Sequence, residues 1–181
     1  RWIIYKTARC EALVHDHMTN LRFADAANAI YEFTWHQFCD WYLELIKPIV
    51  YGEKLAEKKA TQLVLAQTLN RIMRLLHPIA PFITEEIYQK LPIKKEACIV
   101  DVYPTPRNDK EWLALGNEKM ANELDLVIEV IGAIRTIRGE NRIKPGEKLK
   151  VRLIPLEAEG QKILQSNRAY ILNLARLESC D

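Results

Sequence analysis

The stretch RFADAANAIYEFTWHQFCDWYLELIKPIVY, residues 22–51, decides the fold class of this chain. Apolar residues recur through it at the 3.6-residue spacing of an α-helix and fall on one face. These residues are Phe23, Ala27, Ile30, Phe38, Trp41 and Leu45. The pattern predicts one long helix with a wide buried face, which Pro48 kinks or ends and Gly52 follows as a natural stop.

Shorter helical patterns lie on both sides of this stretch. We expect a helix over residues 2–18 that ends at Thr19-Asn20, and another over residues 56–77 that ends before Pro78. In the second of these, the apolar stripe carries Leu65, Leu69, Ile72 and Leu76, so Arg71 and Arg74 are expected to turn away from the core. A fourth, short helix should begin at Pro81, because proline is tolerated in the first turn. Together these patterns predict a helical bundle.

The character of the sequence changes after residue 97. A short apolar run at 97–102 leads into the proline-marked loop Tyr103-Pro104-Thr105-Pro106, so we place a domain boundary near residue 107. Beyond it, an apolar helical stripe runs from Leu124 to Ile134, residues 148–154 alternate as a half-buried strand does, and residues 167–177 form a final helix. The prediction is a helical domain at 1–107 and a small α/β unit at 108–181.

The bulk composition is that of a soluble globular protein. The chain has 181 residues, of which 49% are hydrophobic and 28% are charged, and charges interrupt every apolar run before the roughly 20 residues that a membrane span needs. The four cysteines are scattered, which predicts reduced thiols in a cytoplasmic protein that does not associate with membranes. Because the chain opens without Met or a signal peptide, we expect it to be a piece of a longer protein.

Positive charge is concentrated in one segment. Residues 135–152 hold seven basic and two acidic residues, a local charge of +5, although the whole chain carries only +2. Such cations can neutralise phosphates and release counterions, which points to RNA as the partner, with Arg135, Arg138, Arg142 and Lys144 as backbone contacts. The alternative is a solvated helix end whose arginines complement the helix dipole. The sequence leaves both interpretations open.

The densest group of chemically versatile side chains lies in residues 35–44. His36, Asp40 and Glu44 are spaced by four residues, which suggests a metal site. On one straight helix, however, this spacing spreads three ligands over two turns and around the axis, so we expect no metal. A catalytic pairing of His36 with Cys39 is equally weak, because nothing nearby supplies an oxyanion hole or an orienting third group. We predict no catalytic residue in this chain.

Leu43 is an apolar residue on a polar helix side, among His36, Asp40 and Lys47. A single exposed leucine is ordinary and favours contact with a partner only weakly. Trp35, Trp41 and Tyr42 fit either a core or a stacking surface for bases, and the spacing does not decide between these roles. The chain also lacks a glycine-rich phosphate loop, a nucleotide-binding fingerprint and zinc-ligand spacing.

Several segments closely resemble valyl-tRNA synthetases. They are residues 23–27 (Phe-Ala-Asp-Ala-Ala), 35–44 (Trp-His-Gln-Phe-Cys-Asp-Trp-Tyr-Leu-Glu), 47–48 (Lys-Pro), 75–86 (Leu-Leu-His-Pro-Ile-Ala-Pro-Phe-Ile-Thr-Glu-Glu), 134–138 (Ile-Arg-Thr-Ile-Arg) and 174–179 (Leu-Ala-Arg-Leu-Glu-Ser). The element at 82–86 is shared with isoleucyl- and leucyl-type synthetases, whereas the run at 38–44 followed by Lys47-Pro48 is what resembles the valyl type.

The resemblance implies an anticodon-binding helical bundle, followed by a small α/β junction. In the family an additional bundle helix precedes this region and a coiled-coil arm follows it, and neither is expected in this chain. Leu43 and Glu44 match the end of the family's Asp-Trp-Tyr-Leu-Glu motif and are therefore implied to face the anticodon. We expect Asp40, Lys47 and His36 to lie beside them on the same surface.

The resemblance also implies a function. The parent enzyme would join valine to its tRNA with ATP and Mg²⁺ and edit mistakes, whereas this fragment, without its own cofactor, would only bind valine tRNA isoacceptors and dock on the catalytic domain of the same polypeptide. Two alternatives stay open: the corresponding bundle of isoleucyl-tRNA synthetase, and a helical protein-interaction module without RNA readout.

Overall fold

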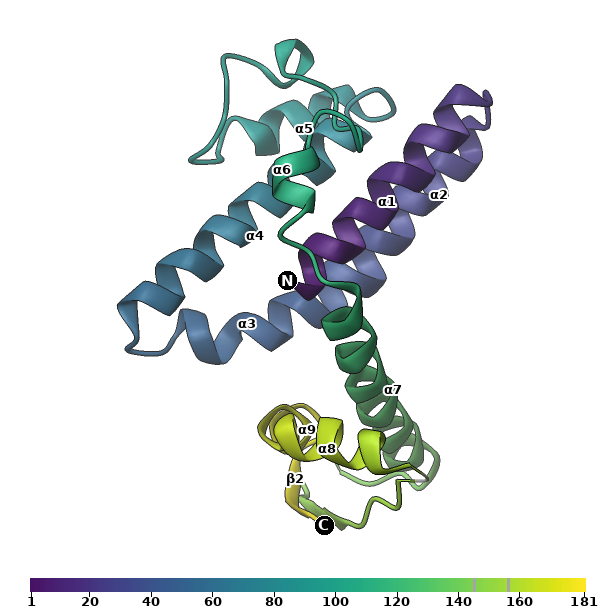
Figure 1. The fold of residues 1–181 in the computed structure, drawn as a ribbon, viewed down its shortest axis with the longest axis vertical. Helices are drawn as coiled ribbons and strands as arrows, with labels where there is room; N and C mark the ends of the chain where they lie inside the picture. Colours follow the sequence, from purple (N-terminus) through teal and green to yellow (C-terminus); the bar gives the residue numbers. More distant parts are fainter. Residues whose placement is uncertain (145, 156) are drawn as a thin grey trace. The chain divides into compact units, whose positions relative to one another are not determined.

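The computed structural model describes residues 1–144, 146–155 and 157–181 of the chain. These residues form two compact units, Arg1–Glu118 and Lys119–Asp181. The predicted fold class is confirmed, because the first unit is a bundle of helices and the second combines helices with a small two-stranded sheet (Figure 1). Within the described ranges, every helix is too short or too polar to cross a membrane.

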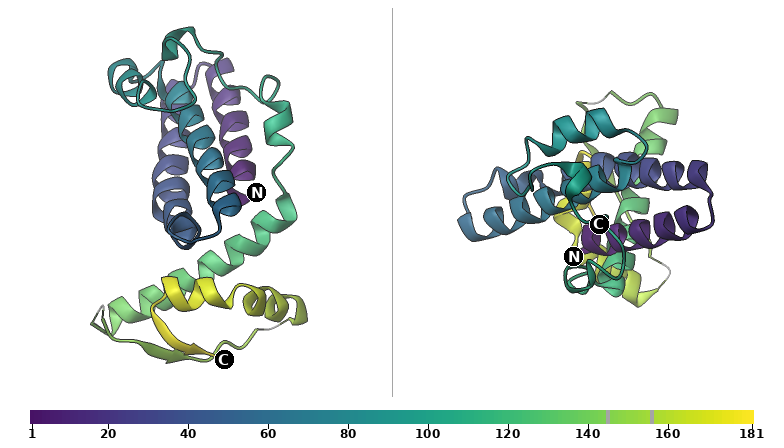
Figure 2. Two further views of the ribbon diagram at one scale, coloured as in Figure 1. Left: turned by 90° about the vertical axis from the view of Figure 1, so that its left-hand side faces the viewer. Right: turned by 90° about the horizontal axis from the view of Figure 1, so that it is seen from above.

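The first unit is built on an antiparallel helix pair. Helix α1 (Trp2–Thr19) and helix α2 (Phe23–Glu32) lie side by side and are joined by a tight turn at Leu21, whose φ is 60°. Helix α4 (Leu55–Leu76) packs across both of them, and helix α5 (Pro81–Tyr88) follows it (Figures 1 and 2). The helices predicted at 2–18, 56–77 and from Pro81 onward are thereby confirmed, whereas the run at 97–102 forms only the short 3₁₀ helix η2 (Cys98–Val100).

The long helix predicted over residues 22–51 forms, but its middle third is wound differently. Helix α2 continues without a loop into the π-helix η1 (Phe33–Tyr42), which continues into α3 (Leu43–Val50). A π-helix closes i→i+5 hydrogen bonds, so each residue advances less around the axis than in an α-helix. The 3.6-residue pattern is therefore wrong here: Trp41 is only partly covered, whereas Tyr42 is buried in its place.

Pro48 and Gly52 have different effects near the end of α3. Pro48 lies inside α3 and does not end it, since the helix continues to Val50. The chain turns at Gly52, where an added Cβ would lie 2.8 Å from the carbonyl oxygen of Pro48. Only glycine allows the chain to pass this close to the preceding turn before α4 begins.

The division between the units differs from the boundary expected near residue 107. Residues 108–118 belong to the first unit, because helix α6 (Lys110–Leu113) packs on α1 and Asp109 pairs with Arg71 of α4. Gly116 also approaches the backbone of α1, where an added Cβ would lie 3.0 Å from the Tyr5 nitrogen. Sequence patterns indicated the loop at 103–106 but not the contacts that return the following segment to the bundle.

The second unit is a small α/β fold around the long helix α7 (Glu118–Glu140). Strand β1 (Leu149–Val151) pairs in parallel with strand β2 (Leu177–Cys180), and helices α8 (Ala158–Ser166) and α9 (Arg168–Leu174) connect them. This crossover is what parallel strands require. The left view in Figure 2 shows the two strands on one side of the helices of this unit. The core is formed by Val127, Ile131, Ile134, Ile171 and Leu177.

The C-terminal stretch corrects one sequence prediction. Residues 167–177 were expected to form a single helix, yet α9 ends at Leu174 and Leu177 already belongs to β2. Arg176 lies between them with a left-handed φ of 55°, which stops the helix and redirects the chain into the sheet. The predicted strand at 148–154 is confirmed as the shorter β1.

Candidate nucleic-acid interface

Five side chains that the sequence singled out lie along one continuous helical segment. His36 and Asp40 come from η1, and Leu43, Glu44 and Lys47 come from α3; together we call them the η1–α3 site. The Nδ1 atom of His36 lies 3.3 Å from Oδ2 of Asp40, and the Nζ atom of Lys47 lies 2.6 Å from Oε1 of Glu44. The structure thus brings these polar residues together in two pairs.

The polar pairs of the η1–α3 site are easily rearranged. All four side chains reach solvent, and exposed ion pairs contribute only about 0–1 kcal/mol to stability. A base edge could therefore replace a partner in either pair at little energetic cost. Leu43 is partly covered by its surroundings, which corrects the picture of an exposed leucine on a polar side.

Exposed aromatic side chains adjoin this site. The rings of Tyr31 and Trp35 lie 6.3 Å apart between centroids, and the ring of Tyr31 lies 6.2 Å from that of His36 in an edge-on arrangement. Trp35 is 51% exposed, so it presents a flat surface of the kind on which bases stack. Tyr42, in contrast, is buried against Phe38, and burial raises its pKa to about 12.

Tyr31 is a residue that sequence analysis missed. Its spacing of four from Trp35 was visible, but the α-helical pattern gave no indication of which aromatic residues face solvent. Within the π-helix, Phe33, Phe38 and Tyr42 enter the core and Trp35 stays outside, next to Tyr31 at the end of α2. The ambiguity over Trp35 and Tyr42 is thereby resolved in opposite directions.

The four predicted backbone-binding cations of the second unit differ in their surroundings. Arg142 and Lys144 are exposed near the end of α7. Arg135 is also exposed, but its Nε and Nη2 atoms donate to the carbonyl oxygen of Leu174 at 3.1 and 3.0 Å. Arg138 is only 8% exposed, and its Nη2 donates to the carbonyl oxygens of Lys144 and Glu147 at 3.1 and 2.7 Å. Arg138 is therefore not part of a solvated helix end.

Comparison with known proteins identifies the family of this chain. Residues 1–153 match the family of anticodon-binding domains of tRNA ligases. The chain belongs to this family. The matched range of the anticodon-binding domain contains the whole η1–α3 site and all four predicted cations.

The chain also resembles individual proteins over nearly its whole length. It is 58% identical to the valine–tRNA ligase of Bdellovibrio bacteriovorus over 181 residues, which are 100% of this chain and 20% of that protein. The valine–tRNA ligase of Geobacter sulfurreducens is 40% identical over 177 residues, 98% of this chain and 20% of the relative. The valine–tRNA ligase of Clostridium acetobutylicum is 37% identical over 182 residues, which are 99% of this chain and 20% of that protein. The chain thus spans about a fifth of the length of these relatives, and the resemblance to the valyl type is confirmed.

Within the anticodon-binding domain, the alternative chemistries at residues 36–44 find little support in the geometry. Glu44 pairs with Lys47 instead of joining His36 and Asp40, and no cluster of three metal-binding side chains occurs among the described residues. Burial, with the nearby charge of Asp40, raises the pKa of the Cys39 thiol. A raised pKa reduces the thiolate fraction, which is the opposite of what a nucleophile needs.

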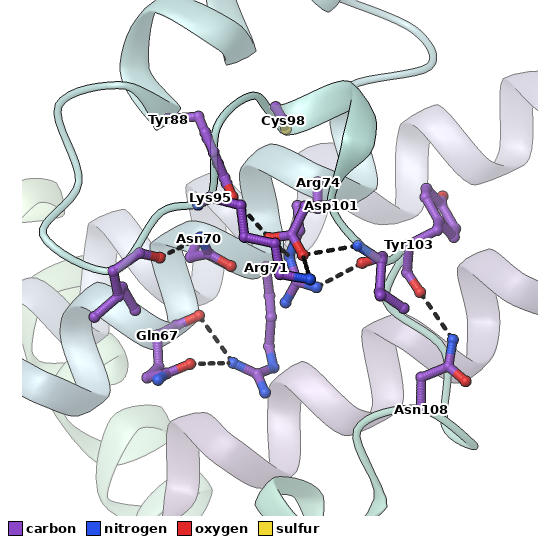
Figure 3. A network of polar contacts seen from close by, with 12 residues as sticks. Gln67, Asn70, Arg71, Arg74, Tyr88, Lys95, Cys98, Asp101, Tyr103 and Asn108 are labelled. Atoms are coloured by element: carbon purple, nitrogen blue, oxygen red, sulfur yellow. Dashed lines mark hydrogen bonds and ion pairs between the residues drawn. The ribbon is translucent and has the colours of Figure 1, made fainter.

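Buried charges form a cluster between α1, α4 and the segment 101–112. We call Glu11, Arg71, Arg74, Asp101 and Asp109 the buried ionic cluster. The expectation that Arg71 and Arg74 turn away from the core is wrong, because both side chains are buried. Figure 3 shows them within a network of polar contacts. The reason is tertiary: acidic groups from distant segments meet these arginines.

Arg71 is the centre of this cluster. Its Nη2 lies 3.0 Å from Oδ1 of Asp109, its Nε lies 3.5 Å from Oε1 of Glu11, and its Nη1 donates to Gln67 at 2.7 Å. The ring of Trp112 stacks on the guanidinium with 3.8 Å between Cζ and the ring centroid. Arg71 therefore joins the segment after residue 101 to α1 and α4, which in turn pack on η1 and α3.

Arg74 and Asp101 form the other half of the cluster. The Nη1 of Arg74 donates to the carbonyl oxygen of Val102 at 2.6 Å. Asp101 accepts from the hydroxyl of Tyr88 at 2.7 Å and pairs with Lys95 at 2.9 Å. These hydrogen bonds and charges more than offset the effect of burial, so the pKa of Asp101 lies below its ordinary value. The carboxylate is charged when it binds these groups.

Proposed function

We propose that this anticodon-binding domain selects valine tRNA by reading its anticodon through the η1–α3 site. The observation that supports this most is that the polar side chains of the valyl-type segment 35–48 reach solvent along a partly π-helical stretch, while its apolar side chains pack into the core. π-Helical turns are rare and occur frequently at functional sites. Single-stranded anticodon bases can stack on aromatic rings while polar side chains bind their edges.

In this proposal the residues have distinct tasks. Glu44 and Lys47 exchange their mutual contact for hydrogen bonds to base edges, His36 and Asp40 do the same on the preceding turn, and Leu43 supplies an apolar contact. Trp35 and Tyr31 offer stacking surfaces beside them. Arg142 and Lys144, with Arg135, contact the RNA backbone and so position the tRNA without reading its sequence.

The whole protein, in this proposal, is a cytoplasmic class I valine–tRNA ligase that consumes ATP. Its ATP and Mg²⁺ would be bound by the catalytic domain of the same polypeptide, since this anticodon-binding domain carries no nucleotide-binding motif. The domain itself would contribute tRNA selection and no catalytic group. Its similarity over its full length to several valine–tRNA ligases supports this assignment.

Substitution of Leu43 and Glu44 tests anticodon reading. In a full-length enzyme that carries this domain, Leu43→Ala and Glu44→Ala should each lower kcat/KM for valine tRNA by about tenfold or more, because a contact to a base is worth about 1–3 kcal/mol. Valine activation in the absence of tRNA should not change. The measurement is aminoacylation kinetics with valine tRNA and with the same tRNA altered in its anticodon.

A matched control is available in the first unit. Glu86→Ala removes an exposed acidic side chain that pairs with Lys90 at 2.6 Å, the same distance as the Glu44–Lys47 pair, and it should leave kcat/KM unchanged. If wild type and both variants of the η1–α3 site lose the same factor on the altered tRNA, these residues do not read the anticodon.

Salt dependence separates RNA binding from a protein-interaction role. Replacing Arg142 with asparagine and Lys144 with glutamine should each flatten the slope of log K against log salt by about 0.7–0.9 for every phosphate that the variant no longer neutralises. Asparagine suits Arg142, whose φ of 52° is left-handed. Lys162→Gln on α8 is the control and should keep the wild-type slope. A wild-type slope near zero would favour the interaction module.

A further inference from the structure

A concave pocket in the second unit is not explained by the contacts described above. It has a volume of about 380 Å³ and lies between the last turn of α7 and the end of α9. Three of its lining residues are arginines, Arg135, Arg138 and Arg176, and the lining residues that the structure describes include no acidic side chain. A pocket whose charged side chains are all positive attracts an anion.

Arg138 forms the buried part of this pocket. Its Nη2 is used by the two loop carbonyl groups, but its Nη1 is buried and has no hydrogen-bonding partner among the described residues. Leaving a buried charged donor unsatisfied is costly, and such groups in proteins are nearly always bound by some acceptor. Arg138 also lines the pocket, so its buried positive charge adds to the potential that an anion would meet there.

Arg135 and Arg176 add charge at the exposed side of the pocket. The double hydrogen bond of Arg135 to Leu174 fixes the direction of its guanidinium. Arg176 follows the end of α9 with a φ of 55°, a position that glycine or asparagine usually occupies. An arginine there accepts backbone strain, which is a common property of functional positions.

We propose that this pocket binds a single phosphate group, and that in the working protein this is a phosphodiester of the RNA backbone. A tetrahedral phosphate has enough oxygen atoms to accept from several guanidinium groups at once, and arginine favours such multidentate contacts. The assignment of the phosphate to an RNA backbone rests on the proposed function, whereas the affinity of the pocket for phosphate does not. The proposal adds Arg176 to the predicted RNA-backbone contacts and places Arg138 on the buried side of the pocket.

Two arginines with the same backbone conformation provide the test. Arg176 lines the pocket and Arg142 does not, yet both have left-handed φ, of 55° and 52°. Asparagine tolerates this conformation, so Arg176→Asn and Arg142→Asn each remove one charge without added strain. Arg176→Gly, which is unstrained there, serves as a second pocket variant if the asparagine variant loses stability.

The 181-residue chain is titrated with inorganic phosphate at constant ionic strength, and binding is followed by NMR. Backbone signals of residues 135–139 and 174–176 should shift, Arg176→Asn should weaken phosphate binding by about tenfold, and Arg142→Asn should not weaken it. Absence of these shifts in the wild type, or equal weakening by both variants, overturns the phosphate site.

A second titration uses valine tRNA instead of phosphate. Arg176→Asn should flatten the salt slope by about 0.7–0.9, the value of one phosphate contact. If phosphate binding depends on Arg176 while tRNA binding does not, the RNA part of the proposal is overturned. If wild-type protein binds phosphate but not tRNA at any salt concentration, the proposed function fails and the phosphate site stands.

Discussion

Replacing Arg71 with alanine should lower the free energy of unfolding of this domain by about 3–5 kcal/mol, the usual cost of removing one partner of a buried ion pair. The substitution would leave Asp109, which pairs with Arg71 at 3.0 Å, without this counter-charge inside the bundle. It would also remove the guanidinium on which Trp112 stacks. Chemical denaturation monitored by circular dichroism measures the change.

An exposed ion pair of the same length is the control for Arg71. Lys54 lies 3.0 Å from Glu57, but its side chain is 79% exposed, so Lys54→Ala should cost at most about 1 kcal/mol. The two pairs have the same separation between nitrogen and oxygen, so the contrast measures what burial and the further contacts of Arg71 add to an ion pair of this length. Similar losses of stability for both variants would show that the buried ionic cluster contributes no more than a surface pair.

The stability of the domain should also fall as the pH rises through the weakly acidic and neutral range. Burial raises the pKa of Glu11 to about 8 from 4.5, and repulsion from Asp109 adds to this, while Arg71 and Arg74 oppose it. Below pH 4.5 the side chain is protonated in both states, so its favourable contribution is complete. As the pH rises toward 8, only the folded state keeps the proton, and stability decreases by up to about 1.4 kcal/mol per pH unit.

Glu11→Gln isolates this effect, because glutamine resembles the protonated side chain at every pH. The free energy of unfolding of wild type relative to Glu11→Gln should fall between pH 5 and pH 8 and become constant above it. The comparison cancels the titration of groups that both variants share, including Asp101, whose lowered pKa acts at lower pH. A difference that does not change with pH would mean that Arg71, 3.5 Å from Glu11, keeps the carboxylate charged throughout.

The helices were accessible from sequence because their signals are local. Apolar spacing, proline positions and glycine stops placed α1, α4 and the combined α2–η1–α3 helix within a few residues. The segments at 35–48 and 75–86 also identified the family without any tertiary information, since their residue order alone is specific. Strand β2 was missed because Leu177 fits the apolar pattern of the preceding helix. Only the pairing with the parallel strand β1 shows that the chain is extended there.

The polar positions were predicted less well. Arg71, Arg74 and Arg138 were placed on the surface because a charged side chain off an apolar stripe usually is exposed. All three are buried, since acidic groups and loop carbonyl groups from other parts of the chain compensate their desolvation. No spacing rule on the helix itself could reveal partners such as Asp109, Asp101 and the Glu147 carbonyl group.

The sequence by itself determined the helical class, the relation to valyl-tRNA synthetases and the segments that carry the η1–α3 site, because periodicity and motif are properties of neighbouring residues. Only the tertiary structure decided which side chains of those segments face solvent, where the first unit ends, and that Arg176 joins Arg135 and Arg138 around one pocket. The physical reason is that burial and charge compensation depend on what the rest of the chain packs against each side chain. A π-helical turn or a buried counter-ion changes that environment without changing the local pattern.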